Sequence, residues 1–368
     1  AIGRLVFASQ LGETAAAVLG GVLAGVSLHR PVTVNAFTAW VPLLVLSILE
    51  GHAWGSDVAL TFLRDVETHV RLLIAAPLLL YAEVRVHRGI PSIVREFVVT
   101  GVVSDAARPR FDAAIASALR LRNSVWAELG LLAVVYAVGI PFVWRDQVAL
   151  DVNSWYATAA AGRLHPFAAG WWAGLVAMPL FQFLCLRWYF RMLIWARFMW
   201  QVSRIPLNLE PLHPDGTAGL HFLALSERAY RPVLLGLGAV LSGMMANRIF
   251  YAGAKLIDFK VEIVGMVALL TLAVLGPLLF FWQPLRAARR SGIEHLGPLG
   301  QRYAREFQSK WMGEGPPPAE PLLGSADIQS LADLRNSYLV VDGLHAVPFS
   351  TRNIMWLAAA VLAPGAGA

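Results

Sequence analysis

The chain has 368 residues, of which 57% are hydrophobic and only 15% are charged, and its mean hydropathy is +0.58. A soluble domain carries about 25% charged residues, so this composition argues against a soluble globular protein. The formal net charge of +6 does not predict nucleic-acid binding, because the basic residues lie mostly in three connections between apolar segments. The single cysteine, Cys185, excludes an internal disulfide and a cysteine-based metal site within one chain.

Six segments are apolar over roughly the 20 residues that a membrane-crossing helix needs. In chain order they are Ala36–Ala53, His69–Val84, Val125–Val143, Phe167–Leu186, Val233–Ala254 and Ile263–Trp282. Two further segments are marginal, because Leu11–Leu28 contains Glu13 and Asn353–Ala363 is short. The sequence therefore predicts an all-α, polytopic transmembrane bundle over residues 1–284, a cytoplasmic segment over 285–350 and a further span within 351–368.

The connections between these segments differ in their basic residues. Twenty Arg and Lys lie in the connections 85–122, 187–231 and 283–335, whereas the alternate connections hold five. Lys and Arg are enriched in the cytoplasmic loops of membrane proteins. We therefore expect the three basic connections to be cytoplasmic, together with His213 and the linker Gly313–Pro318, and we expect Trp155 and Lys255 to be external.

Proline occurs in five of the six apolar segments. The residues are Pro42, Pro77, Pro141, Pro179 and Pro277. A proline inside a helix frees a backbone carbonyl and kinks the helix, and in a bilayer other groups must satisfy that carbonyl. Kinked spans occur in transporters and channels and also in inert bundles, so this pattern leaves both interpretations open.

The cytoplasmic stretch from Leu207 to Leu223, with the sequence LNLEPLHPDGTAGLHFL, is the most distinctive in the chain. His213-Pro-Asp-Gly216 suits a tight turn, and Asp215 is placed to cap a helix that begins near Ala218. A catalytic or metal site would use His213, Asp215 and His221, but three such residues match no known ligand spacing. We expect turn chemistry here, with no metal and no cofactor.

This stretch resembles the His-Pro-Asp-x-x-Gly-Gly-Leu-x-Phe-Leu segment of a family of uncharacterised bacterial multi-spanning membrane proteins. Trp40–Gly51, Phe62–Asp65 and Arg71–Glu83 are also similar to that family. The chain departs from the family at Ala218, where the family has glycine. The resemblance implies a multi-pass protein of a bacterial inner membrane and implies no activity.

Ionisable residues at membrane depth form two groups in this topology. The outer group contains Glu50, His52, Asp57, Asp65, His69, Arg71 and Arg248, and the inner group contains Glu83, Glu128, Arg187 and Arg191. A charge in the bilayer needs a partner or water. We expect the inner carboxylates to pair with the two arginines, which lie four residues apart on one helix face. For a transport protein, we expect Glu50, Arg248, Asp57, Asp65 and Arg71 to form the mouth of the path.

The chain contains no G-x-S-x-G, H-E-x-x-H, P-loop or G-x-G-x-x-G motif, and three functions stay open. The first is a channel or transporter for a small ion or solute. The second is a scaffold or sensor that presents cytoplasmic segments, with Gly292–Val347 as the partner-binding region. The third is an enzyme that acts on lipid through His213 and Asp215. The predicted partners are the bilayer, further copies of the chain and a cytoplasmic protein, and not nucleic acid.

Overall fold

The computed structural model describes residues 32–55, 58, 60–139, 154–160, 163–313, 321 and 324–366. Leu11–Leu28, Asp57, Pro141 and most of the linker after Gly313 therefore lie outside the described residues. The described chain is almost entirely helical, which confirms the all-α prediction. The two strands of its one sheet, β1 (Ala157–Ala160) and β2 (Arg163–Pro166), form a small antiparallel hairpin.

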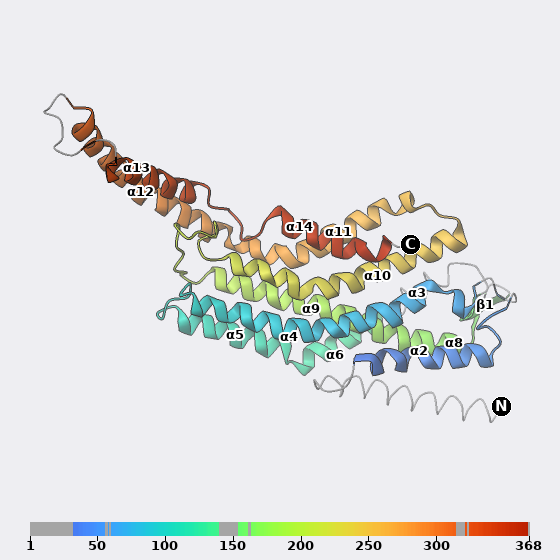
Figure 1. Ribbon diagram of the computed structural model, residues 1–368. Coiled ribbons are helices and arrows are strands. Elements are labelled where there is room, and N and C mark those ends of the chain that lie inside the picture. Colours follow the sequence, from blue (N-terminus) through green and yellow to red (C-terminus); the bar gives the residue numbers. More distant parts are fainter. Residues whose placement is uncertain are drawn as a thin grey trace.

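Long helices run side by side in an elongated bundle (Figure 1). The α-helices of the described chain, which include the short α3 and α8, are α2 (Val32–Leu49), α3 (Val66–His69), α4 (Ala76–Val99), α5 (Arg108–Arg122), α6 (Val125–Val134), α8 (Ala168–Trp172), α9 (Met178–Ser203), α10 (Ser226–Ala252), α11 (Lys260–Leu275), α12 (Trp282–Trp311), α13 (Ala326–Asp342) and α14 (Thr351–Leu362). Short helical turns join or extend them: η1 (Phe62–Arg64), η2 (Val70–Ala75), η3 (Val135–Gly139), η4 (Ala173–Ala177), η5 (His221–Leu225), η6 (Leu256–Phe259), η7 (Gly276–Phe281) and η8 (Ala363–Gly365).

The two ends of the bundle differ. One end, called the hairpin end below, carries α3 and the β1–β2 hairpin (Figure 1). The other end carries the tip of α5, and from it α12 and α13 project well beyond the other helices. These two helices pack on each other as an antiparallel pair, which we call the arm. The bundle thus has one compact end and one extended end.

The main hydrophobic core joins α4, α9 and α10 to η7. Phe97, Met199 and Phe281 are completely buried in it, and Phe97 meets Phe222 edge to face at a centroid distance of 5.0 Å. Phe222 belongs to the loop motif identified in the sequence, so this core also fixes the loop between α9 and α10 against α4. The loop is therefore packed firmly against the bundle.

The prolines of the apolar segments sit beside altered helical turns. Pro77 and Pro179 follow the π-helical turns η2 and η4, and Pro277 lies in the 3₁₀ turn η7. Proline has no N–H to donate to the preceding turn, and a local change of helical period accommodates it. Pro42 lies inside α2.

Three helices of the described chain are long and apolar enough to cross a membrane: Ala168–Ser203, His221–Tyr251 and Leu256–Trp311. The pair Arg108–Arg122 and Val125–Gly139, bent by 47°, makes a fourth if it is one span. The prediction of six spans is therefore met only in part by length and composition. The described apolar helix within α2 is only Ala39–Leu49, and His69–Val84 belongs to a helical run, Val66–Val99, that carries many charges.

Candidate functional site

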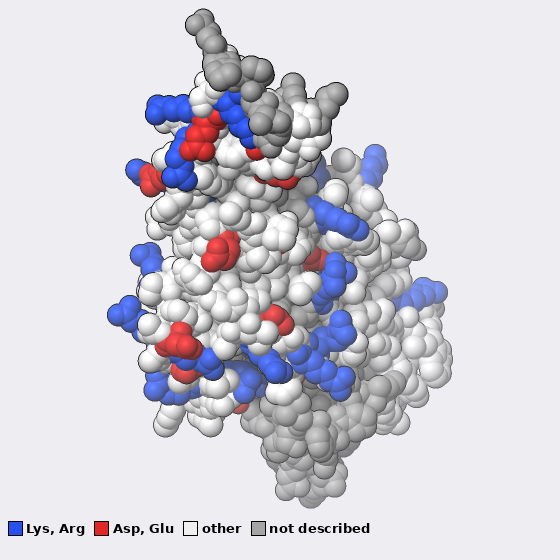
Figure 2. Space-filling view, turned by 60° about the vertical axis from the view of Figure 1, so that its left-hand side comes forward, with Lys and Arg blue, Asp and Glu red and all other residues white. Residues whose placement is uncertain are grey.

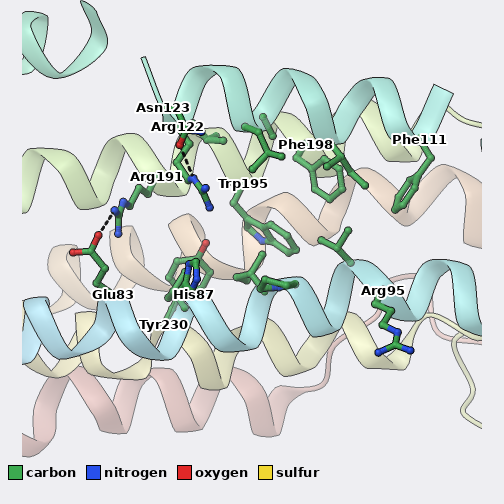
Figure 3. Close-up of a pocket in the computed structure, with 18 of the residues that line it drawn as sticks. Glu83, His87, Arg95, Phe111, Arg122, Asn123, Arg191, Trp195, Phe198 and Tyr230 are labelled. Carbon is green, nitrogen blue, oxygen red and sulfur yellow. Dashed lines mark hydrogen bonds and ion pairs between the residues drawn. The ribbon is translucent and has the colours of Figure 1, made fainter. Parts of the chain in front are cut away.

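Four charged side chains meet where α4, α6 and α9 come together. The Arg187 guanidinium lies 3.3 Å from the carboxylate of Glu128 and 3.8 Å from that of Glu83. Arg191, one turn further along α9, donates a hydrogen bond to Glu83 (Figure 3). These side chains are largely buried, and that of Arg187 is only 11% exposed. The predicted pairing of the inner group is therefore confirmed.

A pocket of about 960 Å³ begins at this cluster and extends along α4 toward Val99. Figure 3 shows α4 and α5 on its two sides, with residues of α9 between them. Its apolar walls come from all three helices: Ile90, Val94 and Val98 of α4, Ile115 of α5, and Trp195 and Phe198 of α9. At the end away from the cluster it is bordered by Arg95 and Arg108. The composition of the pocket is that of a small-molecule site, with apolar walls and a few polar groups.

Trp195 is the unusual polar residue of this pocket. Its side chain is only 5% exposed, and its indole Nε1 is buried with no hydrogen-bond partner among the residues that the structure describes. Figure 3 places the ring in the middle of the pocket. Buried donors are normally paired, so this unpaired indole N–H distinguishes Trp195 from Trp188, which donates to the carbonyl oxygen of Leu79 at 3.0 Å. The sequence showed only an aromatic residue at helical spacing and gave no signal for this role.

Asp65, from the predicted outer group, is the centre of a buried hydrogen-bond network at the hairpin end. It is 5% exposed and accepts hydrogen bonds from Nε1 of Trp155 at 3.0 Å, Nδ2 of Asn247 at 2.8 Å and the backbone N–H of Thr68 at 3.1 Å. The network joins α3, α10 and the segment before the hairpin. Asn247 is a member that the sequence interpretation missed, because it considered only ionisable residues.

The other described members of the outer group do not converge on one cavity. Glu50 accepts hydrogen bonds from the backbone N–H groups of Ala168 and Ala169, at 2.6 and 3.2 Å, and so caps the start of α8. Arg248 is exposed on α10. Glu50 and Arg248 line neither the pocket described above nor a second one, of about 690 Å³, along Trp282–Glu294 of α12.

Arg71 and the two outer histidines make local contacts. Arg71 pairs with Glu67, one turn earlier in the same helix, and lies over the ring of Phe181 at 5.8 Å. The Nδ1 atom of His69 accepts a hydrogen bond from Nε1 of Trp40 at 2.9 Å. His52 packs on Phe167 with a centroid distance of 4.1 Å. Glu67 was missed in the sequence, although its four-residue spacing from Arg71 is a readable signal.

Asp215 organises the loop motif as a turn. Its carboxylate accepts hydrogen bonds from the backbone N–H groups of Thr217, Gly219 and His221, at 2.8, 3.1 and 3.1 Å. Nδ1 of His213 lies 3.0 Å from the same carboxylate. The turn chemistry was predicted correctly, but no helix begins near Ala218. A 3₁₀ turn, η5, starts at His221 instead, because Ala218 has a φ of +53°. That left-handed conformation favours glycine, the residue expected here from the family resemblance.

The pH dependence of stability should report on this turn. Burial raises the pKa of Asp215, but the hydrogen bonds from the backbone of Thr217, Gly219 and His221 outweigh it and lower the pKa to about 2. A carboxylate with a lowered folded-state pKa stabilises the fold above its unfolded pKa of about 4 and loses that contribution as the pH falls toward 2. We therefore expect Asp215→Asn to lower the melting temperature at pH 7, with a difference that shrinks between pH 4 and pH 2.

Thermal unfolding of the wild type and Asp215→Asn in detergent, at a series of pH values, tests this expectation. Asp333→Asn is the control, because Asp333 is exposed on the arm. A difference between Asp215→Asn and the wild type that stays constant down to pH 2 would contradict the assigned hydrogen bonds.

Among the described residues, no group of three or more His, Cys, Asp or Glu side chains is placed to hold a metal ion. His213 and Asp215 do not line the pocket between α4 and α5. Comparison of the chain with protein-family models, with curated proteins and with solved structures found no match. The family resemblance therefore stays a prediction, and the site has to be interpreted from its own geometry.

Proposed function

We propose that the chain is a multi-pass protein of a bacterial inner membrane that acts as a scaffold or sensor and presents its arm to a cytoplasmic protein. The observation that carries this proposal is the geometry of the arm. Its two helices extend beyond the bundle (Figure 1) and pack on each other, and Gly292 of α12 lies close to Pro211 in the loop between α9 and α10. Such a rigid projection is suited to holding a partner at a fixed place near the membrane.

Contacts at both ends of the arm make it rigid. Near the bundle, Arg289 of α12 pairs with Asp342 of α13 at 2.6 Å. Gly292 lets the helices approach, because a Cβ there would lie 2.7 Å from Val341. At the far end, Asp327 pairs with Lys310 at 2.7 Å and accepts a hydrogen bond from Nε1 of Trp311 at 3.0 Å. Between these ends, large apolar side chains of α13, including Ile328 and Leu339, are exposed, and they offer a surface to a partner.

The proposal keeps six membrane spans, and the distribution of charge supports those of α2, α4, α10 and α11. No charged residue occurs in α2, or between Arg71 and Glu83 in α4. The same holds between Arg231 and Arg248 in α10 and between Glu262 and Arg286 in α11 and α12. At about 1.5 Å per residue, the stretch in α10 is roughly 25 Å long, close to the roughly 30 Å of a bilayer core.

The orientation follows from the basic residues. Figure 2 brings the arm end forward, and the Lys and Arg side chains on it are more prominent than the Asp and Glu side chains. Exposed arginines at this end include Arg88, Arg95, Arg110 and Arg228. An excess of exposed arginine at one end of a helical membrane protein favours a cytoplasmic location, and we place the arm there.

Cysteine labelling tests this topology. In a Cys185→Ala background, we expect an impermeant thiol reagent applied from outside to label Lys255→Cys and to leave His213→Cys unlabelled until the membrane is opened. Both positions are exposed. His213 lies in the loop before α10 and Lys255 follows the end of that helix, so the two labelling results together show whether α10 crosses the membrane. Labelling of His213→Cys from outside would reverse the orientation, and labelling of both from outside would show that α10 does not cross the membrane.

A solute path is the second candidate function, and one observation favours it. Arg71 is 8% exposed, pairs with Glu67, and lies within the π-helical turn η2. Buried charge at membrane depth and π-helical turns both occur at functional sites. The scaffold proposal treats this pair as structural, and the path hypothesis treats it as part of a conduit.

Flux in liposomes separates the two functions. If the chain is a scaffold, liposomes that contain the wild type should take up ions and protons no faster than empty liposomes. If it forms a path, the wild type should show flux that Arg71→Gln changes. Arg88→Gln is the control, because Arg88 is exposed on the other half of the same helical run. Wild-type flux above that of empty liposomes would overturn the scaffold as the sole function.

A further inference from the structure

The pocket between α4 and α5 is long enough to restrict the shape of a ligand. The residues of α4 that line it extend from Glu83 to Val99, a distance of about 24 Å at 1.5 Å per residue. Because α5 packs mainly against α9 and the ring of Phe111 meets that of Phe97 in α4 near one end, at a centroid distance of 5.5 Å, the space between α4 and α5 stays open along most of this length. A groove of these proportions with apolar walls fits an extended alkyl chain better than a compact solute.

The charges around the pocket are unequal. Glu83 and Glu128 are already engaged by Arg187 and Arg191. The remaining charged side chains of the lining are Arg95, Arg108 and Arg122, with His87 as a further titratable group. Of these three arginines, Arg108 pairs with Asp112 at 3.1 Å, and no ion pair of Arg95 is found among the described residues. The pocket therefore has an excess of positive charge, which favours an anionic ligand.

The unpaired indole N–H of Trp195 adds a third requirement. It lies between the charged ends of the pocket, is buried, and has no acceptor within the described part of the chain. A ligand that fills the pocket with hydrocarbon alone would leave this donor unsatisfied, which is unfavourable. A ligand with a carbonyl oxygen between its charged head and its alkyl chain would satisfy it.

We propose that this pocket binds an ester-linked lipid with a phosphate head. Its alkyl chain would lie between α4 and α5, its phosphate would meet Arg95 and Arg108, and its ester carbonyl would accept the hydrogen bond of Trp195. The proposal goes beyond the scaffold function, because it gives the protein a lipid ligand, bound between α4, α5 and α9. Neither proposal depends on the other, since the arm and the pocket are lined by different helices.

Binding of 1-palmitoyl lysophosphatidate to the purified full-length chain in a non-ionic detergent, measured by native mass spectrometry, tests the proposal. We expect one bound equivalent and at least tenfold weaker binding of the zwitterionic lysophosphatidylcholine. Arg95→Gln should weaken lysophosphatidate binding by about tenfold, as expected for the loss of a hydrogen bond to a charged group. Arg88→Gln is the matched control, because Arg88 lies on the same helix outside the pocket and should bind like the wild type.

The hydrogen bond from Trp195 is tested separately, by comparing the binding of ester-linked and ether-linked ligands. An ether-linked analogue of the ligand lacks the carbonyl acceptor, so we expect the wild type to bind it several-fold more weakly than the ester. In Trp195→Phe the ester and the ether should bind equally, because the donor is gone while the aromatic ring remains. A persistent preference for the ester in Trp195→Phe would remove Trp195 from the site.

Two variants that fill the pocket test its location. Ile90→Trp and Ala118→Leu add bulk from α4 and from α5 respectively, and either one, if its melting temperature matches the wild type, should abolish binding. Undiminished binding in a folded variant, or no binding to the wild type, would overturn the proposal.

Competition by inorganic phosphate alone at equal concentration would also overturn the proposal, because the alkyl chain would then contribute nothing to binding. Competition by dipalmitoyl phosphatidate would identify the bilayer as the source of the ligand, and its failure to compete would identify a monomeric single-chain lipid.

Discussion

Replacing Glu83 with alanine should lower the free energy of unfolding by about 3 kcal/mol. Glu83 is the carboxylate that Arg191 and Arg187 share, so its loss leaves two largely buried guanidinium groups with only Glu128 as a partner. Removing one member of a buried pair costs about 3–5 kcal/mol. We expect a loss at the lower end of this energy range, because the Glu83 side chain is 26% exposed and water screens part of its interaction with the arginines.

An exposed pair in the same chain provides the control. Arg290 and Glu294 are separated by 2.8 Å, but their side chains are 82% and 59% exposed. Exposed pairs contribute about 0–1 kcal/mol, so Glu294→Ala should have little effect in the same detergent unfolding experiment. Arg191→Ala combined with Glu83→Ala should lose less stability than the two single changes added together. Simple addition of the two losses would show that the side chains do not interact.

The inner cluster could be predicted from the sequence because two local signals agree on it. Arg187 and Arg191 share a helix face through their four-residue spacing, and the alternation of basic connections puts Glu83 and Glu128 at the same depth. The network around Asp65 could not be predicted in this way. It depends on Trp155, which reaches Asp65 across 90 positions of sequence, and neither residue carries a periodic pattern that indicates the contact.

The pocket was also beyond prediction, and the reason is geometric. Val86, Ile90, Val94 and Val98 recur every four residues along α4, which the sequence alone presents as an ordinary packing face. The pocket exists because α5 packs on α9 and leaves this face of α4 partly uncovered. Helical periodicity shows which face is apolar but does not show which neighbour covers it.

The prediction of membrane spans from apolar segments has a related limit, because it does not show how a segment continues or what covers it. Arg71, Glu83 and Arg85 lie within the helical run Val66–Val99, so the apolar part of α4 is short and charges flank it closely. Tyr303, Phe307 and Trp311 follow one another at four-residue intervals, a spacing that predicts an aromatic stripe on one helix face but not what covers it. In the structure, the Tyr303 hydroxyl and the Trp311 indole both donate hydrogen bonds to Asp327 of α13, so this stripe faces the other helix of the arm.

Replacing Gly238 with alanine should dislodge α14 from the bundle. Gly238 lies on α10, and a Cβ at this position would stand 2.1 Å from the carbonyl oxygen of Val361 in α14. No side-chain rotation relieves a contact with backbone, so one of the helices has to move. Forcing extra atoms into a packed contact costs about 1–3 kcal/mol, and α14, a helix of 12 residues, is the smaller of the two.

Cross-linking measures the displacement of α14 directly. A Cβ built on Gly365 lies 3.9 Å from the Cβ of Ser242, which is within the range of about 3.5–4.5 Å for a disulfide. In a Cys185→Ala background, the pair Ser242→Cys and Gly365→Cys should therefore oxidise readily, and the addition of Gly238→Ala should slow this reaction at least tenfold. Gly265→Ala in α11 is the control, because nothing lies within 4 Å of a Cβ there, and it should leave both the cross-linking rate and the melting temperature near their starting values. Unchanged cross-linking in the Gly238→Ala background would mean that α14 does not pack on α10 through this glycine.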